Sequence, residues 1–150
     1  MIIVGIVAAA VLLPILFHSM PANHPPASDT ASNTSSGTAG RIEVVYFHRT
    51  QRCYSCRYVE AETRYTVETY FEDELASGTV TFQVINIQDE ANADIVKKYG
   101  AYTSSLFINT VRDGTDHIEE TIDLYLLIGR DEAFGNALRS KIQKSLEGDT

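Results

Sequence analysis

The distribution of apolar and polar residues divides the chain into three parts. Residues 1–17 are apolar throughout, and residues 18–40 consist mainly of proline, serine, threonine, alanine, asparagine and glycine. From residue 41 to residue 147, short apolar runs alternate with stretches whose apolar residues recur at helical spacing. Only this last pattern is typical of a domain with a buried core. The sequence therefore predicts a hydrophobic segment, a disordered Pro/Ser/Thr-rich tether and one folded domain.

The third part contains patterns for both strands and helices. Runs of β-branched and aromatic residues predict strands, and apolar residues three or four positions apart predict helices. We expect strands at residues 42–47, 80–87, 105–111 and 117–121, and helices at residues 92–99, 123–128 and 131–146. A further, long helix is expected to begin near residue 53 and to end at Gly78. Its expected buried face consists of Val59, Val67, Tyr70, Phe71 and Leu75.

The order of these elements predicts a fold class. Strand, helix and strand form a crossover unit that places the first two strands parallel in one sheet. The last two strands flank Asp113-Gly114, a pair that favours a tight hairpin turn, so they extend the sheet in antiparallel fashion. We therefore predict an α/β fold of the order βαβ–α–ββ–α. It is a three-layer sandwich with a central mixed sheet, preceded by an N-terminal hydrophobic helix.

Residues 1–17 are a candidate membrane anchor. They contain no charged side chain and a single proline, Pro14. Such a length is at the short limit of a membrane-spanning helix and slightly above that of a signal-peptide core. We favour an uncleaved anchor because no convincing cleavage site follows; a cleaved signal and a start at Met20 are the alternatives. An anchored domain is expected outside the cytoplasm, in the periplasm or at the cell surface, whereas cleavage would lead to secretion.

The charge of the chain argues against one class of partner. The sequence has 12 lysines and arginines against 20 aspartates and glutamates, which gives a net charge of −8. Binding to a phosphate backbone needs clustered positive charge, and an acidic domain does not provide it. We therefore expect no nucleic acid among the partners of this chain.

The chain has two cysteines, Cys53 and Cys56, in the stretch HRTQRCYSCRYVE that follows the first predicted strand. Cys53 is expected at the N-terminus of the long helix, where unpaired N–H groups and the helix dipole favour a thiolate. The neighbouring Arg52 and Arg57 are candidates for favouring that thiolate further. Cys56, one turn inside the helix, is placed to resolve a mixed disulfide on Cys53. His48, where the strand ends, is the titratable base nearest in sequence and a candidate proton carrier, with a surface or capping role as the alternative.

Three interpretations of the cysteine pair remain open. A redox-active dithiol is favoured because Cys-x-x-Cys at the strand-to-helix junction of a βαβ unit is typical of redox sites. Two thiolates alone also suit a soft metal such as Cu(I), or arsenite, whereas a structural zinc needs four ligands and only His48 and His117 are available as histidines within the domain. A structural staple is the least favoured, because closing so short a loop removes little entropy from the unfolded chain.

The cysteine pair in this setting resembles the thioredoxin-like superfamily, and the element order of residues 41–146 is similar to the thioredoxin core. More narrowly, YFHRTQRCYSCRYVE, VINIQDEAN and KKYGAYTSSLFI resemble a small family catalogued as nitrophenyl compound nitroreductase subunit of the arsenic-operon type (ArsF family). The residues that carry this signature are Tyr46, Phe47, His48, Thr50, Arg52, Cys53, Cys56 and Glu60. The superfamily resemblance implies exchange with protein thiols or disulfides and requires no cofactor; nothing in the sequence indicates a flavin site.

Two departures from thioredoxin concern the site. Thioredoxins carry a cis-proline that faces the cysteines; the corresponding loop here is Ser104-Ser105, and the domain contains no proline. A cis bond without proline costs ~3 kcal/mol, so we predict a trans bond and a more open approach to the cysteines. Thioredoxins also bury an aspartate beneath the cysteines, and the matching position here is close to Tyr46.

These observations predict a membrane-tethered, thioredoxin-like protein that performs thiol–disulfide exchange, with Cys53 as nucleophile and Cys56 as resolving cysteine. The expected partners are protein thiols or disulfides, a membrane redox protein among them, and the membrane itself through residues 1–17. Two rival functions use the same domain. One is a non-enzymatic binding module that holds a soft metal or arsenite on the two cysteines, and the other is a redox-inert adaptor that docks a partner.

Overall fold

The computed structural model describes residues 40–148 of the chain. The described residues all belong to one compact unit. The predicted N-terminal hydrophobic helix and all but the last residue of the predicted tether lie outside the described residues. Within residues 40–148, no helix is long and apolar enough to cross a membrane.

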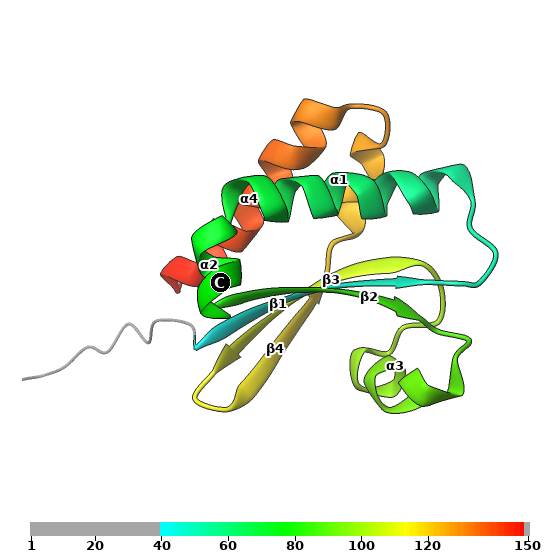
Figure 1. The fold of residues 1–150 in the computed structure, drawn as a ribbon, viewed down its shortest axis with the longest axis horizontal. Coiled ribbons are helices and arrows are strands. Elements are labelled where there is room, and N and C mark those ends of the chain that lie inside the picture. Colours follow the sequence, from blue (N-terminus) through cyan, green and yellow to red (C-terminus); the bar gives the residue numbers. More distant parts are fainter. Residues whose placement is uncertain (1–39, 149–150) are drawn as a thin grey trace, which may run out of the picture. The chain divides into compact units, whose positions relative to one another are not determined.

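A four-stranded mixed sheet forms the centre of the described domain (Figure 1). Its strands are β1 (Arg41–His48), β2 (Val80–Asn86), β3 (Ser105–Arg112) and β4 (Thr115–Glu120), in the order β2-β1-β3-β4. β1 and β2 run parallel, with Ile42 opposite Val80, and β3 pairs antiparallel with both β1 and β4. The predicted crossover unit, hairpin and mixed sheet are confirmed.

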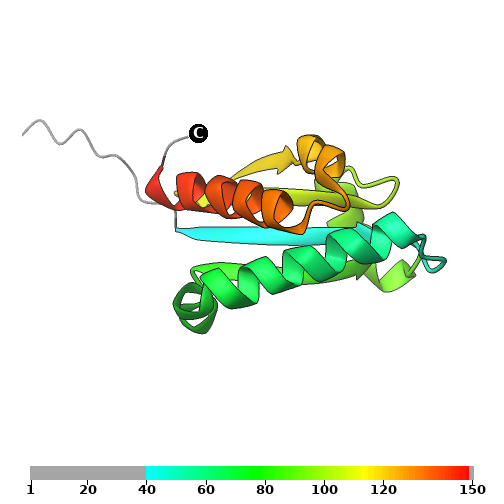
Figure 2. The same cartoon turned by 90° about the horizontal axis from the view of Figure 1, so that it is seen from above.

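Helices cover both faces of this sheet, as predicted. The helices are α1 (Tyr54–Tyr70), α2 (Glu72–Ser77), α3 (Ala93–Tyr99) and α4 (Asp131–Glu147), with short 3₁₀ helices η1 (Glu90–Asn92) and η2 (Ile122–Leu127). Figures 1 and 2 show α1 and α4 together over one face, whereas α3 lies below the other. The result is the expected three layers.

Alternation along β1 gives the domain two separate cores, because successive strand side chains point to opposite faces. Ile42, Val44 and Tyr46 are fully buried on the face covered by α1 and α4. Val45 and Phe47 are buried on the other face, under α3. The larger core contains the first face of β1 together with Val59, Val67, Phe71, Leu124, Phe134, Leu138 and Ile142. β1 is therefore an inner strand of the sheet that packs against both helical layers.

The single long helix predicted to follow the cysteines is in fact two helices. α1 ends at Tyr70, Phe71 leaves helical geometry with φ −133° and ψ 35°, and α2 follows. The break has a packing cause, because Phe71 is 2% exposed and lies in the larger core. Tyr70, predicted to be buried, is 44% exposed, so that part of the prediction is wrong. Gly78, with φ 76°, ends α2 in the left-handed conformation that glycine adopts without strain.

The hairpin between β3 and β4 has the predicted two-residue turn. Asp113 and Gly114 both have positive φ, 49° and 76°, while Arg112 pairs with Thr115. Two central residues with positive φ define a type I′ turn, whose twist matches that of the flanking strands. The turn therefore fixes the register in which β4 joins the sheet.

Candidate functional site

The connection from β1 to α1 carries both cysteines. Cys53 is the N-cap of α1, with extended backbone at φ −76° and ψ 172°, and its Sγ accepts a hydrogen bond from the N–H of Cys56 at 3.2 Å. A disulfide joins Cys53 to Cys56, whose Cα atoms are 5.1 Å apart. The two cysteines thus lie where the sequence indicated, at the N-cap and in the first turn of the helix that follows β1.

The two sulfur-bearing residues differ in their surroundings. Cys53 is exposed to solvent, whereas Cys56 is partly buried. The Ser55 hydroxyl lies 3.1 Å from Cys53 Sγ, and it donates the hydrogen bond because a disulfide sulfur carries no proton. Cys53 Sγ therefore receives both an N–H and an O–H donor. Donors of this kind also stabilise a thiolate, and the exposed sulfur is the one that an incoming partner can reach.

Tyr46 supports the cysteines from below. Its side chain is fully buried in the larger core, and its hydroxyl donates to the carbonyl oxygen of Cys56 at 2.7 Å. Burial raises the pKa of Tyr46 above its ordinary value, so the phenol is neutral. The position at which the thioredoxin resemblance implies a buried carboxylate therefore holds a neutral hydrogen-bond donor. This donor reaches the backbone of the resolving cysteine, not its sulfur.

A cavity of about 360 Å³ opens at the disulfide. It is lined by Arg49, Gln51, Cys53, Ser55, Cys56, Thr103, Ser104 and Tyr125. Arg49 is the one charged residue in this lining, and hydroxyl and amide groups supply most of the rest. The arrangement gives a partner sulfur access to Cys53 within a mainly polar, solvent-facing recess.

The loop before β3 lies on the far side of that cavity. The described residues contain no cis peptide bond, so the Ser104–Ser105 bond is trans, as predicted. Ser104 lines the cavity, whereas Ser105 is 3% exposed and begins β3. The Tyr125 hydroxyl donates to the carbonyl oxygen of Ser104 at 3.2 Å, which connects η2 to this loop. Of the two serines expected to face the cysteines, the structure places only Ser104 there.

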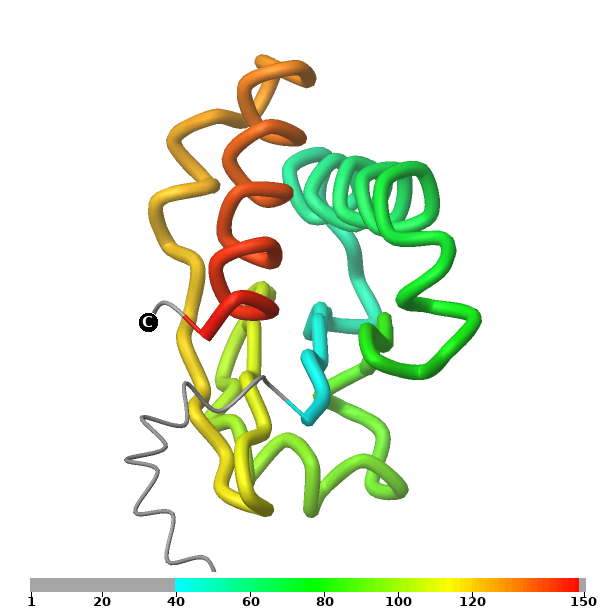
Figure 3. Tube along the Cα trace, turned by 90° about the vertical axis from the view of Figure 1, so that its left-hand side faces the viewer, coloured from blue at the N-terminus to red at the C-terminus, as the bar shows by residue number. Residues whose placement is uncertain are grey.

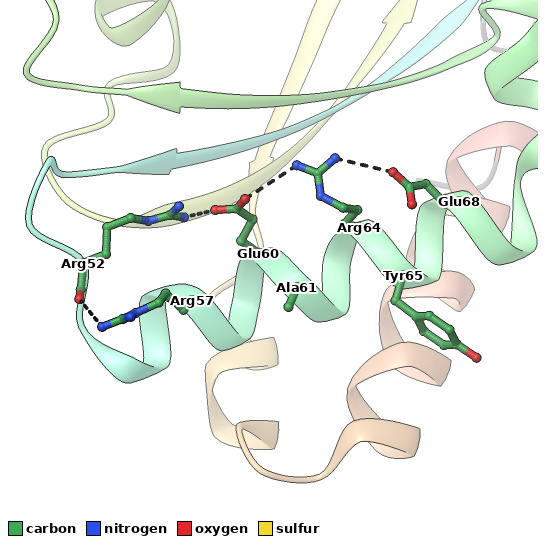
Figure 4. Close-up of a pocket in the computed structure, with 7 residues that line it drawn as sticks. All are labelled: Arg52, Arg57, Glu60, Ala61, Arg64, Tyr65 and Glu68. Carbon is green, nitrogen blue, oxygen red and sulfur yellow. Dashed lines mark hydrogen bonds and ion pairs between the residues drawn. The ribbon is translucent and has the colours of Figure 1, made fainter.

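The side chains of Arg57 and Arg64 on α1, and of Arg52 on the loop before it, lie along one side of this helix (Figure 4). Arg52 forms an ion pair with Glu60, and Arg64 pairs with Glu60 at 3.5 Å and with Glu68 at 3.4 Å. Arg57 donates to the carbonyl oxygen of Arg52 at 3.3 Å. Arg52 and Arg57 thereby line a second cavity beside α1 and are not part of the lining at the disulfide. Their expected effect on a Cys53 thiolate stays a prediction.

His48 points its ring nitrogen at the backbone. Its Nδ1 lies 2.8 Å from the carbonyl oxygen of Arg49, so Nδ1 carries the proton and donates it. The ring is stacked near Tyr46, with centroids 6.4 Å apart, and His48 is not among the residues that line the cavity at the disulfide. The structure thus gives His48 a capping contact at the end of β1, and its predicted role as a proton carrier stays a prediction.

Several residues of this site escaped the sequence analysis. Gln51 and Ser55 lie within the quoted cysteine stretch, so proximity alone could have nominated them. Thr103 is the neighbour of the predicted Ser104. Tyr125 comes from η2, and no local pattern in the sequence links it to the cysteines.

Between residues 40 and 148, no group of three or more His, Cys, Asp or Glu side chains is placed to hold a metal ion. A four-ligand zinc site built from the described residues is therefore not formed. A two-thiolate site for a soft metal or arsenite needs only Cys53 and Cys56, and this finding does not address it.

Taken together, the sheet order, the parallel β1–β2 pair, the β3–β4 hairpin and the Cys-x-x-Cys disulfide at the start of α1 define a thioredoxin-like α/β domain. No protein-family model matches the chain, and no curated protein matches it. The family implied by the narrower resemblance therefore has no support from these comparisons.

Three of the solved structures similar to the chain are thioredoxins or a thioredoxin domain. The Trx4 domain of ERdj5 is 14% identical with a TM-score of 0.45, over 72% of this chain and 85% of that chain. A thioredoxin from Thermus thermophilus is 15% identical with a TM-score of 0.44, over 71% and 77% respectively. Oxidised thioredoxin O2 from Arabidopsis thaliana is 16% identical with a TM-score of 0.41, over 67% and 80%. These identities and TM-scores are low, so the fold is assigned from the strand order and strand directions described above.

Proposed function

We propose that this protein performs thiol–disulfide exchange through Cys53 and Cys56. The observation that carries the proposal is the exposed Cys53 Sγ at the N-cap of α1, bonded to Cys56 and facing an open cavity. Hydrogen bonds from the Cys56 N–H and the Ser55 hydroxyl to this sulfur support its role as the attacking or attacked atom. Protein thiols and disulfides are the proposed substrates.

The exchange proceeds in two balanced steps. In the reduced protein, the Cys53 thiolate attacks a substrate disulfide, forms a mixed disulfide and releases one substrate thiolate. Cys56 then loses its proton and attacks Cys53 Sγ, which restores the Cys53–Cys56 disulfide and releases the second substrate thiolate. Two electrons pass from the protein to the substrate. The oxidised protein runs the same steps in reverse, with a substrate dithiol as the electron donor.

The decisive experiment measures the reactivity of each cysteine in the reduced full-length chain. Iodoacetamide labelling across pH should modify Cys53 first, with a midpoint below the ~8.5 of a free cysteine. Ser55→Ala should move that midpoint upward because it removes a donor to the sulfur, and Arg52→Ala and Arg57→Ala test the predicted electrostatic contribution. Equal labelling of both cysteines, with a midpoint near the free value, would refute the redox assignment.

Trapping of the intermediate separates the two cysteine roles. With Cys56→Ser, the mixed disulfide on Cys53 cannot be resolved and should accumulate with a disulfide substrate such as insulin. Cys53→Ser provides the matched control, and it should yield no adduct. Accumulation on Cys56 in that control would reverse the assigned roles.

The soft-metal function remains a second proposal for the same pair. It is supported by the chemistry of two adjacent thiols and by a trans Ser104–Ser105 bond, which leaves the approach without a cis-proline. Metal or arsenic bound stoichiometrically after anaerobic purification, together with no insulin reduction, would establish it. A redox-inert adaptor would show neither property.

We also propose that the domain is tethered to a membrane through residues 1–17 and acts outside the cytoplasm, where a membrane redox protein is a partner. The apolar sequence of that segment supports this proposal. Membership in the arsenic-operon family is proposed on the signature around Tyr46 and Cys53 alone. Fractionation of cells that express the full-length chain should leave it in membranes, with the domain accessible to protease from outside. Recovery in the soluble fraction with an N-terminus beyond Met20 would contradict the anchor.

A further inference from the structure

The two edges of the sheet formed by the described residues differ in composition. β4 carries three carboxylates, Asp116, Glu119 and Glu120. β2, with the sequence VTFQVIN, has seven residues and neither a charge nor a proline. Charges, prolines and very short strands are the means by which proteins prevent an edge strand from pairing with another chain. β4 has such protection and β2 lacks it.

Hydrogen bonds to β1 fix which groups of β2 face outward. Ile42 N–H donates to the carbonyl oxygen of Thr79 at 2.7 Å, and Ile87 N–H donates to that of His48 at 2.9 Å. Backbone groups of alternate residues point to opposite sides of a strand, so residues 79, 81, 83, 85 and 87 face β1. The N–H and C=O groups of Val80, Phe82 and Val84 therefore face the open side. No strand between residues 40 and 148 pairs with them there.

We propose that β2 pairs antiparallel with β2 of a second copy of this chain, around a two-fold axis at Gln83. In this register Val80 lies opposite Asn86, Thr81 opposite Ile85 and Phe82 opposite Val84 of the partner subunit. Phe82 and Val84 present outward N–H and C=O groups, so their two pairs supply four hydrogen bonds. Every facing pair is apolar or neutral, and all seven residues of the strand are used. The two four-stranded sheets become one continuous sheet.

The charges on α1 suit the same two-fold axis. Arg64 lies over the Phe82 ring, 5.1 Å from its centroid, so this side of α1 flanks the middle of β2. Figure 3 also shows α1 and α2 on the side of the sheet opposite β4. The charges along this side of α1 alternate in sign, in the order Arg57, Glu60, Arg64 and Glu68 (Figure 4). We call these four residues the charged row.

A two-fold axis reverses the charged row of the second copy. The axis at Gln83 is adjacent to Phe82, and Arg64, on α1, lies over Phe82. The two α1 helices therefore run antiparallel and pass each other near Arg64, so that Arg57 lies near Glu68 of the partner subunit. Opposite charges then face one another at both ends of the row. Ala61, small and exposed, lies between them and leaves space for the facing helix. Strand register and helix charge are thus self-complementary about the same axis, which favours a second copy over an unrelated segment as the occupant.

Site-directed crosslinking tests the register. The full-length chain carrying Cys53→Ser and Cys56→Ser receives Gln83→Cys, is oxidised with diamide and is run on a non-reducing gel. The two introduced cysteines face each other across the axis, so a dimer of twice 16.6 kDa should form. Thr81→Cys is the matched control on the same face of the strand. Its two copies would be about 13 Å apart along the strands, beyond the ~7 Å that a disulfide can span. Absence of the Gln83→Cys dimer, or equal yields from both variants, overturns the proposal.

Charge exchange on α1 provides an independent readout. Arg57→Glu and Glu68→Arg should each lower the crosslinking yield of Gln83→Cys several-fold, since each places like charges opposite one another. The double variant carries Glu at 57 and Arg at 68 in both copies, so the attraction is restored and the yield should recover. Recovery is not expected if a different segment of the chain or another protein occupies the edge. A double variant as defective as the single ones overturns the second-copy assignment.

Discussion

Replacement of Tyr46 by phenylalanine tests how the core holds the resolving cysteine. The ring is fully buried, and phenylalanine preserves its packing, so the substitution removes only the hydroxyl that donates to the Cys56 carbonyl at 2.7 Å. That carbonyl also accepts the backbone N–H of Glu60 within α1, so it keeps one partner. The loss is therefore that of one net hydrogen bond, and the free energy of unfolding should fall by ~0.5–1.5 kcal/mol.

Chemical denaturation of the oxidised full-length chain measures this change. Tyr46→Ala provides the comparison, because it removes the ring as well and should cost ~3–5 kcal/mol, as for other large aromatic truncations. The gap between the two variants isolates the packing of the ring from the hydrogen bond. A Tyr46→Phe variant as stable as the parent would show that the hydroxyl contributes nothing net. A loss equal to that of Tyr46→Ala would show that the packing of the ring contributes nothing beyond the hydroxyl, against its full burial.

Three further predictions concern stability. Arg52→Ala should lower the free energy of unfolding by about 1–2 kcal/mol, because it leaves the partly buried Glu60 with Arg64 alone. Arg57 is exposed, so Arg57→Ala should change the free energy of unfolding by no more than about 0.5 kcal/mol. Equal effects of the two variants in chemical denaturation would contradict the pairing of Arg52 with Glu60. Burial acts to raise the pKa of Glu43, but hydrogen bonds, the largest from Tyr99, hold that pKa below its ordinary value of 4.5. Glu43 therefore stabilises the folded state above pH 4.5, and this stabilisation is lost as the pH falls through the lower pKa of the folded state. Glu43→Gln should reduce the loss of stability at low pH, and an unchanged profile of stability against pH would refute this. Gly114→Ala should cost about 1 kcal/mol in thermal unfolding because φ there is 76°, and no loss would contradict the turn.

Local signals in the sequence were sufficient for most of the fold. The Asp113-Gly114 pair predicted a hairpin because positive φ at two successive residues is a local requirement that few sequences meet. The parallel pairing of β1 with β2 followed from the helix between them, because parallel neighbours need a long crossover connection. These features depend on residues close in sequence, which is why a pattern reveals them.

The break at Phe71 was missed because its cause is not local. Helical spacing continues through residues 59–75, and neither glycine nor proline interrupts it. Phe71 leaves helical geometry, with φ −133°, and its side chain packs in a core that is built by strands and by α4 far along the chain. Tyr70 consequently turns outward, against its apolar character. Packing overrides a periodic pattern wherever one large side chain has a better buried position outside the helix.

The candidate site shows the same division between local and distant causes. The N-cap position of Cys53 could be predicted, because the end of a strand and the start of a helix are both visible in the sequence. The thioredoxin resemblance indicated that the residue near position 46 lies beneath the cysteines, but it did not predict the hydrogen bond from Tyr46 to Cys56. Tyr125 could not be predicted, since its contact with Ser104 depends on how η2 packs beside the loop before β3.

The groups that donate hydrogen bonds to the two cysteines are neutral, and this affects how the reactivity of Cys53 depends on salt. The Cys56 N–H, the Ser55 hydroxyl and the Tyr46 hydroxyl contact the cysteines directly, whereas Arg52 is paired with Glu60 and Arg57 with a backbone carbonyl. Hydrogen bonds of this kind act at contact distance and are little affected by salt, but the field of an exposed arginine is screened within ~10 Å at 0.1 M ionic strength. The reactivity of Cys53 should therefore depend more on Ser55 than on ionic strength. A labelling midpoint that follows salt but ignores Ser55→Ala would instead assign the control of the thiolate to the arginines.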